Sequence, residues 1–222
     1  QTRLLVLDFS ILFDKLPLFA QAAKLTVGLA FAGIILSIIL GLICALIRYF
    51  QIPVLRQIAL GYIELSRNTP LVIQLFFLYY GLPRLGIMLE GVTCAIVGLA
   101  FLGGGYMAEA FRSGLEAVGK VQVESGLSIG LNRIQLIRYV ILPQAFAVAV
   151  PAISANTIFL IKETSVFSIV ALADLVYVAK DLMKEGHSTE TNFMLVVCYL
   201  IIILPVSVLF THLERRMQRA GF

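Results

Sequence analysis

Long apolar runs alternate with short polar intervals along most of the chain. Four of these runs, residues 25–47, 91–108, 139–161 and 191–211, contain no Asp, Glu, Lys or Arg. About 20 consecutive apolar residues in a helix span the roughly 30 Å hydrocarbon core of a membrane. We therefore expect each run to form a transmembrane helix.

A fifth apolar run, residues 58–80, is interrupted near its middle by the polar segment Arg67-Asn68-Thr69-Pro70. Pro70 lacks a backbone N–H and disfavours helical geometry at Thr69. Unpaired backbone groups at membrane depth are tolerated only against protein or water. The pattern predicts a broken transmembrane helix that lines a cavity, and a kink made for helix packing is the alternative.

The composition supports a membrane protein. Hydrophobic residues make up 60% of the 222 residues and charged residues 14%, whereas about a quarter of the residues in a soluble domain are charged. The three cysteines, Cys44, Cys94 and Cys198, lie inside apolar runs, so we interpret them as small hydrophobic residues and not as a disulfide or a metal site. The sequence predicts an all-α membrane protein with a single domain over residues 1–222.

The first 19 residues mix apolar positions with the charged residues Arg3, Asp8, Asp14 and Lys15. This pattern predicts an amphipathic helix that lies on the membrane surface as an anchor. A mobile chain end is the alternative. We therefore separate an N-terminal segment, residues 1–19, from the remainder of the domain.

The positions of Lys and Arg predict the orientation, because these residues prefer the cytoplasmic side. The loop at residues 48–56, the polar stretch at 112–138 and the tail at 215–219 should all be cytoplasmic. This arrangement requires the short apolar piece at residues 164–179 to be re-entrant or to lie at the outer surface. We expect five transmembrane helices, with the N-terminus outside and the C-terminus inside.

A long polar stretch between two of the predicted transmembrane helices has a helix–turn–helix pattern. Glu124 lies in the first half of a short helix predicted at about residues 119–131. Gly130 would end this helix, because glycine tolerates the left-handed conformation. A second helix should start at Arg133, and Pro143 should lie where that helix meets the membrane. An ordinary surface loop is the alternative.

This stretch resembles the cytoplasmic coupling loop of ABC importer permeases, whose pattern is Glu-Ala-Ala, a Gly several residues later, and then Ile/Leu-Leu-Pro. The matching residues are Glu124, Gly130, Leu142 and Pro143, whereas Ser125 and Gly126 replace the two alanines. The chain also resembles the polar amino acid permease family on both sides of this stretch. The residues that carry this resemblance are 64–71, 106–109 with 112–114, 142–145, Asn156 and 162–165. The resemblance implies the ABC type I importer permease fold, with a core over residues 20–215 and a cytoplasmic coupling helix.

The resemblance implies partners and not catalysis by this chain. The sequence contains no P-loop motif, so we expect it to bind neither ATP nor another cofactor. The family implies two ATP-binding cassette ATPase subunits that carry ATP and magnesium, a second permease subunit that is identical or related, and an extracytoplasmic amino-acid-binding protein. It also implies the lipid bilayer of the bacterial cytoplasmic (inner) membrane and no nucleic acid. The expected coupling residues are Glu124, Ser125, Gly126, Gly130, Leu142 and Pro143.

Polar residues at membrane depth predict a substrate site, because such residues are costly in lipid and usually functional. Amides, hydroxyls and free carbonyls at a helix break could bind the charged ends of an amino acid. Glu163 could receive a cationic side chain, which favours arginine, lysine or histidine. Alternatively, Lys162 and Glu163 only mark the outer end of a helix and neutralise each other. The predicted substrate residues are Asn68, Thr69, Ser154, Asn156, Thr157, Glu163 and Thr164.

Glu64 and Glu109 are a further pair of acids that the pattern predicts to be buried. Interhelical bonding is favoured over a role in a gate.

A different class of function remains open: an ion-driven carrier or a membrane-embedded enzyme that works without an ATPase. A carrier usually has an internal repeat, and the sequence shows none. An enzyme needs a convergent nucleophile, base or set of metal ligands, whereas His187 and His212 are far apart. Co-purification of a tightly bound ATPase would separate a permease from both alternatives.

Overall fold

The computed structural model describes residues 9–219, and every regular element in this part of the chain is a helix. The all-α prediction is therefore confirmed. The elements are, in chain order, α1 (Phe9–Tyr49), α2 (Leu55–Arg67), α3 (Leu71–Phe76), the π-helix η1 (Phe77–Gly81), the 3-10 helix η2 (Leu82–Leu85), α4 (Gly91–Ala117), α5 (Lys120–Ser128), α6 (Arg133–Leu136), the π-helix η3 (Ile137–Ile141), α7 (Leu142–Glu163), the 3-10 helix η4 (Thr164–Val170), α8 (Leu175–Lys184) and α9 (Ser188–Arg219).

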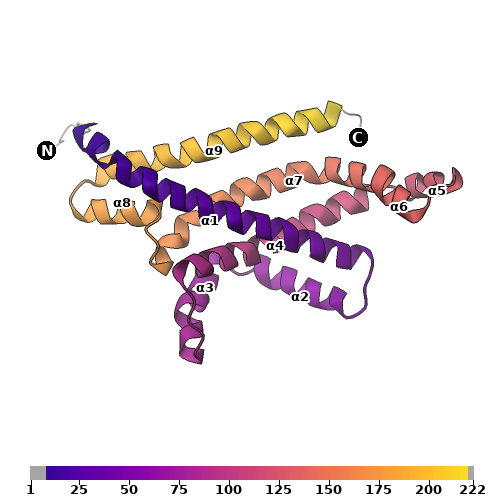
Figure 1. Cartoon of the computed structure of the whole chain (residues 1–222), viewed down its shortest axis with the longest axis horizontal. Helices are drawn as coiled ribbons and strands as arrows, with labels where there is room; N and C mark the ends of the chain where they lie inside the picture. The colour runs from indigo at the N-terminus through magenta and orange to yellow at the C-terminus, as the bar shows by residue number, and fades with distance from the viewer. Residues whose placement is uncertain (1–8, 220–222) are drawn as a thin grey trace.

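Each of the four charge-free runs lies in a helical stretch that is long and apolar enough to cross a membrane, which confirms these predictions. The four stretches lie along the long axis of the molecule (Figure 1). The predicted second span is divided between α2 and the shorter apolar stretch Leu71–Leu85, so the number of crossings stays a prediction. The four long stretches are Phe13–Tyr49, Gly91–Ala117, Arg133–Val170 and Ser188–Met217.

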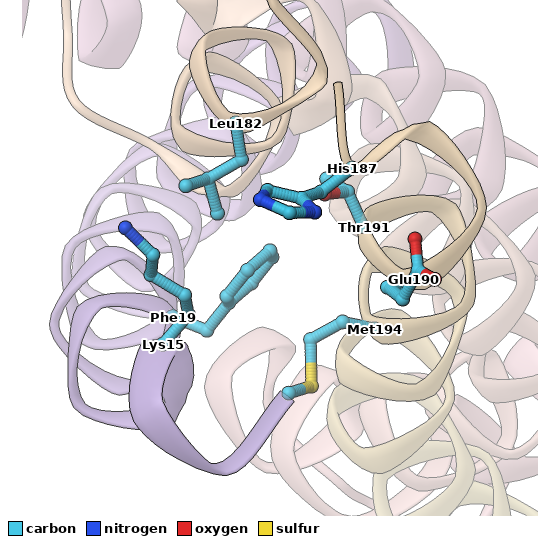
Figure 2. Close-up of a pocket in the computed structure, with 7 residues that line it drawn as sticks. All are labelled: Lys15, Phe19, Leu182, His187, Glu190, Thr191 and Met194. Atoms are coloured by element: carbon cyan, nitrogen blue, oxygen red, sulfur yellow. The ribbon is translucent and has the colours of Figure 1, made fainter. Parts of the chain in front are cut away.

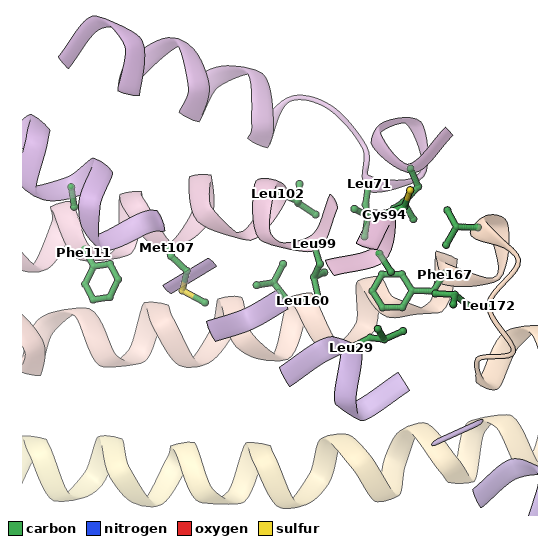
Figure 3. Close-up of a cluster of buried hydrophobic side chains, with 14 of the residues drawn as sticks. Leu29, Leu71, Cys94, Leu99, Leu102, Met107, Phe111, Leu160, Phe167 and Leu172 are labelled. Atoms are coloured by element: carbon green, nitrogen blue, oxygen red, sulfur yellow. The ribbon is translucent and has the colours of Figure 1, made fainter. Parts of the chain in front are cut away.

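Helix α4 is the centre of the core, because α1 and α7 both pack along it. This packing depends on small residues. A Cβ added at Gly41 would lie 2.4 Å from Met107 Cβ, and one added at Gly103 would lie 2.2 Å from Ser37 Oγ. In lipid, such close approach supplies the packing energy that holds helices together. Figure 3 shows the buried side chains between these helices, which include Leu29, Leu99, Met107 and Leu160.

The N-terminal segment differs from the prediction. α1 runs without interruption from Phe9 to Tyr49, so residues 9–19 extend the first long helix and form no separate surface helix. Phe19 packs in a buried cluster with Leu182 and Met194, which ties this end of α1 to α8 and α9. The remainder of that prediction, residues 1–8, lies outside the described residues.

The apolar piece at residues 164–179 forms a corner between α7 and α9. η4 ends at Val170, Ala171 adopts a left-handed φ of 56°, and α8 then starts after Asp174. α8 extends beyond the apolar piece, to Lys184. With 10 residues, α8 is too short to cross a membrane. This length agrees with the prediction that residues 164–179 do not form a transmembrane helix.

Candidate coupling surface and substrate pathway

The polar stretch expected to couple to an ATPase folds as a helical hairpin, residues 120–136, which we call the α5–α6 hairpin. Gly130 has a left-handed φ of 86° and ends α5, as expected. The N–H groups of Gly130 and Leu131 donate to the carbonyls of Leu127 and Gly126 at 3.0 and 3.1 Å, so the turn closes on its own backbone. In Figure 1 the hairpin projects beyond the end of α7.

A capping box starts the second helix of the hairpin. The Asn132 side chain accepts the N–H of Gln135 at 2.9 Å, and the Gln135 side chain accepts the N–H of Asn132 at 2.9 Å. The sequence carries a signal for this pair, an Asn followed three residues later by a Gln, which our sequence analysis missed. The predicted start of this helix at Arg133 is confirmed.

Gly126 explains one departure from the family pattern. A Cβ at this position would lie 2.5 Å from Leu136 Cδ1, so glycine lets α5 approach α6 closely. Glu124 and Ser125 lie on the exposed side of α5. The Gln144 side-chain amide donates to Gln122 Oε1 at 3.1 Å, which joins α5 to the beginning of α7.

The α5–α6 hairpin exposes large apolar side chains although it lies in a polar stretch of the sequence. Val121 is 73% exposed, Ile129 79% and Ile134 77%. From Arg133 the chain continues as α6, η3 and α7 without a gap up to Glu163, through Leu142 and Pro143. A force applied at the hairpin therefore acts at the end of a continuous helical rod that runs through the core.

The break at Pro70 is closed by a side chain that the sequence analysis did not identify. Gln74 is nearly buried, and its amide donates to the Ser66 carbonyl at 3.2 Å and to the Thr69 carbonyl at 3.1 Å. Asn68 Nδ2 donates to the Glu64 carbonyl at 2.8 Å. The Ser66 and Thr69 carbonyls, which face the break, are thereby paired within the protein.

A hollow of about 450 Å³ lies beside this break, between α2, α3 and η1 on one side and α4 on the other. Thr69 lines the hollow, as expected for a broken helix beside a cavity, and its hydroxyl donates to the Leu65 carbonyl at 2.8 Å. Apolar side chains supply most of the wall, which is formed by Leu65, Thr69, Ile73, Gln74, Phe77, Leu78, Val97, Gly98 and Phe101.

The predicted substrate residues of α7 and η4 are mostly occupied in packing. Ser154, Thr157 and Thr164 are buried, and each hydroxyl donates to a carbonyl of α7, at 2.7, 2.8 and 2.7 Å. Asn156 Nδ2 donates to the Tyr106 carbonyl of α4 at 3.1 Å. Glu163 is half-buried at the end of α7, while Lys162 is exposed, and no ion pair joins the two within the described residues.

Tyr106 connects the two groups of predicted substrate residues. Arg67 precedes Asn68 in the sequence, and its guanidinium lies 5.3 Å from the centre of the Tyr106 ring. The same ring lies 5.1 Å from the ring of Phe159 on α7. The broken span and α7 therefore both contact α4 at Tyr106. Tyr106 belongs to a block that resembles the permease family, but the sequence did not predict these contacts, because a tyrosine after three glycines carries no sign of its neighbours.

An ion-pair network joins α1 to α4 close to the end that carries the hairpin. Arg48 of α1 bonds to Glu109, which also accepts from Arg112 at 2.8 Å, and Arg112 reaches Glu116. Glu109 and Arg112 pair at i,i+3, and the interhelical role expected for Glu109 is confirmed. Glu64 is exposed, so the prediction that it is a buried acid is wrong.

A second, much smaller hollow of about 10 Å³ lies where α1, α8 and α9 meet (Figure 2). A space of this size has room for one water molecule at most, so it cannot hold an amino acid. Among the described residues, no group of three or more His, Cys, Asp or Glu side chains is placed to hold a metal ion. The residues around the hollow are Lys15, Phe19, Leu182, His187, Glu190, Thr191 and Met194.

Comparisons with known proteins agree with this architecture. A family model described as "Binding-protein-dependent transport system inner membrane component" matches residues 10–219. The chain is 35% identical to the probable amino-acid permease protein YxeN of Bacillus subtilis, over 96% of this chain and 97% of YxeN. It is 33% identical to the glutamine transport system permease protein GlnP of Escherichia coli, over 95% and 98% of the two chains. A crystal structure of an amino acid ABC transporter with histidines matches with a TM-score of 0.87 and 31% identity, over 96% of this chain and 100% of that chain.

Proposed function

Because this chain belongs to the family of binding-protein-dependent transport system inner membrane components, we propose that it carries basic amino acids inward, driven by an ATPase that docks on the α5–α6 hairpin. Its relatives are permeases of amino acid ABC transporters, so the chain is an amino acid permease of the inner membrane with the type I importer fold. The proposal adds the substrate class, the docking surface and the orientation.

The exposed apolar side chains of the hairpin carry the proposal. Exposed apolar surface is unfavourable in water. A partner that covers Val121, Ile129 and Ile134 would therefore gain about 25 cal/mol of binding free energy for each Å² of apolar surface buried. A helix of the length of α5 has little stability alone, so a groove in the partner would fix its position. Glu124 lies on the exposed side and is available for a polar contact at the same surface.

The family pattern supports a complete assembly with two ATPase subunits, a second permease, identical or related, and an external amino-acid-binding protein. ATP and magnesium belong to the ATPase subunits. The Arg-rich tail and the hairpin then lie in the cytoplasm and the N-terminus outside, with five crossings if α2 and α3 together count as one.

The hairpin is tested by changing Ile134 to Glu in the assembled complex. A charge in place of an apolar contact should reduce the amount of ATPase that co-purifies with the permease, and transport should fall at least about tenfold, because a buried unpaired charge costs several kcal/mol. The measurements are ATPase stoichiometry after purification and substrate uptake by proteoliposomes.

Met88 provides the matched control, because it is 84% exposed and precedes α4, at the opposite end of that helix from the hairpin. Met88→Glu makes the same chemical change and should leave ATPase co-purification intact. Normal ATPase binding by the Ile134→Glu protein would refute the docking surface. A permease that purifies active without any ATPase would favour an ion-driven carrier.

The substrate class depends on Glu163, the one acid among the predicted substrate residues. It is half-buried, and no ion pair to Lys162 engages it. The related structure holds histidines, whereas GlnP is named for glutamine, so the relatives differ on this point. Glu163→Gln should lower uptake of arginine or lysine about tenfold or more and change uptake of glutamine little, because only the cationic side chains lose a charge partner. Equal effects on arginine and glutamine would exclude the cation pocket.

A further inference from the structure

Asp174 is a fully buried carboxyl group at the corner where α8 starts. Its Oδ1 accepts the N–H of Tyr177 at 2.9 Å and so caps α8. The N–H of the next residue, Leu175, donates to the Thr26 hydroxyl of α1 at 3.3 Å. α8 also packs against η4 and α9. The carboxyl group therefore lies at the point where four elements are fastened together.

The second oxygen of this carboxyl group, Oδ2, is buried and has no hydrogen-bond partner among the described residues. A buried carboxylate with an unpaired oxygen is costly, whereas the protonated carboxyl group carries no charge and gains a donor. Because Oδ2 itself is enclosed, a proton fits at this place and a hydrated cation does not.

The charged and titratable groups around Asp174 do not neutralise it. Lys180, on the same helix, is exposed, and its ammonium group donates to the Ser168 hydroxyl of η4 at 3.1 Å. Tyr199 of α9 lies within electrostatic range, and its hydroxyl is 3.5 Å from that of Thr164. α1 presents the uncharged Thr26. Burial raises the pKa of Asp174 to about 6 and outweighs the opposing effects of the nearby Tyr177 and Val176 N–H groups and of the Lys180 charge.

We propose that Asp174 is a proton-binding site and that uptake of one proton closes the corner formed by α1, η4, α8 and α9. An open corner would hydrate the carboxyl group and return its pKa to the ordinary value of 3.8. Because the pKa is higher in the closed corner, the proton favours the closed form at low pH, and this advantage is lost as the pH rises through about 6. The equilibrium between the open and closed corner should then shift toward the open form by about tenfold from pH 5 to pH 7.

Amide hydrogen exchange of α8 in the assembled transporter tests the site. After correction for intrinsic exchange rates, the α8 amides should be about tenfold less protected at pH 7 than at pH 5. Asp174→Asn keeps the cap, because asparagine also accepts at this position, and should bring the ratio to one. The exposed Asp181 on the same helix gives the control, since Asp181→Asn should keep the tenfold ratio.

If the α8 amides of the wild-type protein were equally protected at pH 5 and pH 7, the proposal would be overturned. This measurement uses the wild-type protein alone and does not depend on the folding of a variant. A tenfold ratio that persists in Asp174→Asn would overturn it as well, because another group would then be responsible.

The side from which the proton comes rests on the orientation in the proposed function, in which this corner faces outward. Uptake by proteoliposomes with one orientation of the complex should respond to the pH on the side opposite the α5–α6 hairpin, and Asp174→Asn should abolish this response. A response only to the pH on the hairpin side would refute the orientation and support the proton site. No response on either side, together with an exchange ratio of one, would remove the proton site.

Discussion

The chain interrupts its helices at Pro70 and at Gly130, and it repairs the two interruptions by different means. At Pro70 the carbonyls of Ser66 and Thr69 are paired by the amide of Gln74, a nearly buried side chain from the next helix. At Gly130 the backbone turns back on itself, and the exposed side chain of Asn132 caps the helix that follows.

The difference follows from the solvent. The broken span at Pro70 is predicted to lie at membrane depth, where no water is available to pair a free carbonyl and the protein has to provide the donor itself. At the exposed hairpin, water can replace any bond that is lost. A break inside the membrane therefore requires a buried side-chain donor from the following helix, whereas a break in water requires only a turn and an exposed cap.

Replacing Gln74 by Leu should have the largest effect, because it leaves two carbonyls without their donor in an apolar environment. We expect a loss of about 2–4 kcal/mol in the free energy of unfolding. Removal of the unpaired Gln74 Oε1 offsets part of this loss. The measurement is a dodecyl sulfate unfolding titration of the purified protein, followed by circular dichroism.

Asn132→Ala is the matched change at the exposed break. It removes the cap of α6, but water can solvate the freed N–H, so a smaller loss of about 1 kcal/mol is expected. Equal losses in the two variants would contradict the comparison, since the effect would then not depend on the solvent.

The sequence was sufficient to predict features that depend on local chemistry. The four charge-free runs, the break at Pro70, the left-handed Gly130 and the start of a helix at Arg133 are all present. Each depends on hydrophobicity over one helix length or on the backbone preferences of Gly and Pro. Such properties act within a few residues and need no knowledge of neighbours.

The sequence was not sufficient to predict which side chains meet across the fold. Gln74 follows Pro70 by four residues and looks like any polar residue in an apolar helix. Ser154 and Thr157 were expected to face a pathway, yet their hydroxyls bond to their own helix. Asp174 could have been predicted as the N-cap of α8, because Asp is a favoured residue immediately before a helix. It was hidden because residues 164–179 were treated as one apolar piece.

Gly130 tests the exposed break through the conformation of its backbone. Its φ of 86° lies where an L-residue is strained, so Gly130→Ala should cost about 1–2 kcal/mol in hairpin stability although space for the methyl group is free. The measurement is the protection of the Leu131 amide, whose bond to Gly126 closes the turn, by hydrogen exchange. We expect about a tenfold loss of protection.

Gly119 separates strain from the mere addition of a methyl group. It also has free space around its Cα, but its φ of −64° suits any residue, so Gly119→Ala should leave the Leu131 amide unchanged. Gly130→Asn should recover much of the loss, because asparagine tolerates the left-handed region better than alanine. If Gly119→Ala and Gly130→Ala lowered protection equally, the cause would be general loosening of the hairpin and not backbone strain. The exposed break would then depend on the flexibility of glycine at both ends of α5, and its contrast with the rigidly paired break at Pro70 would become sharper.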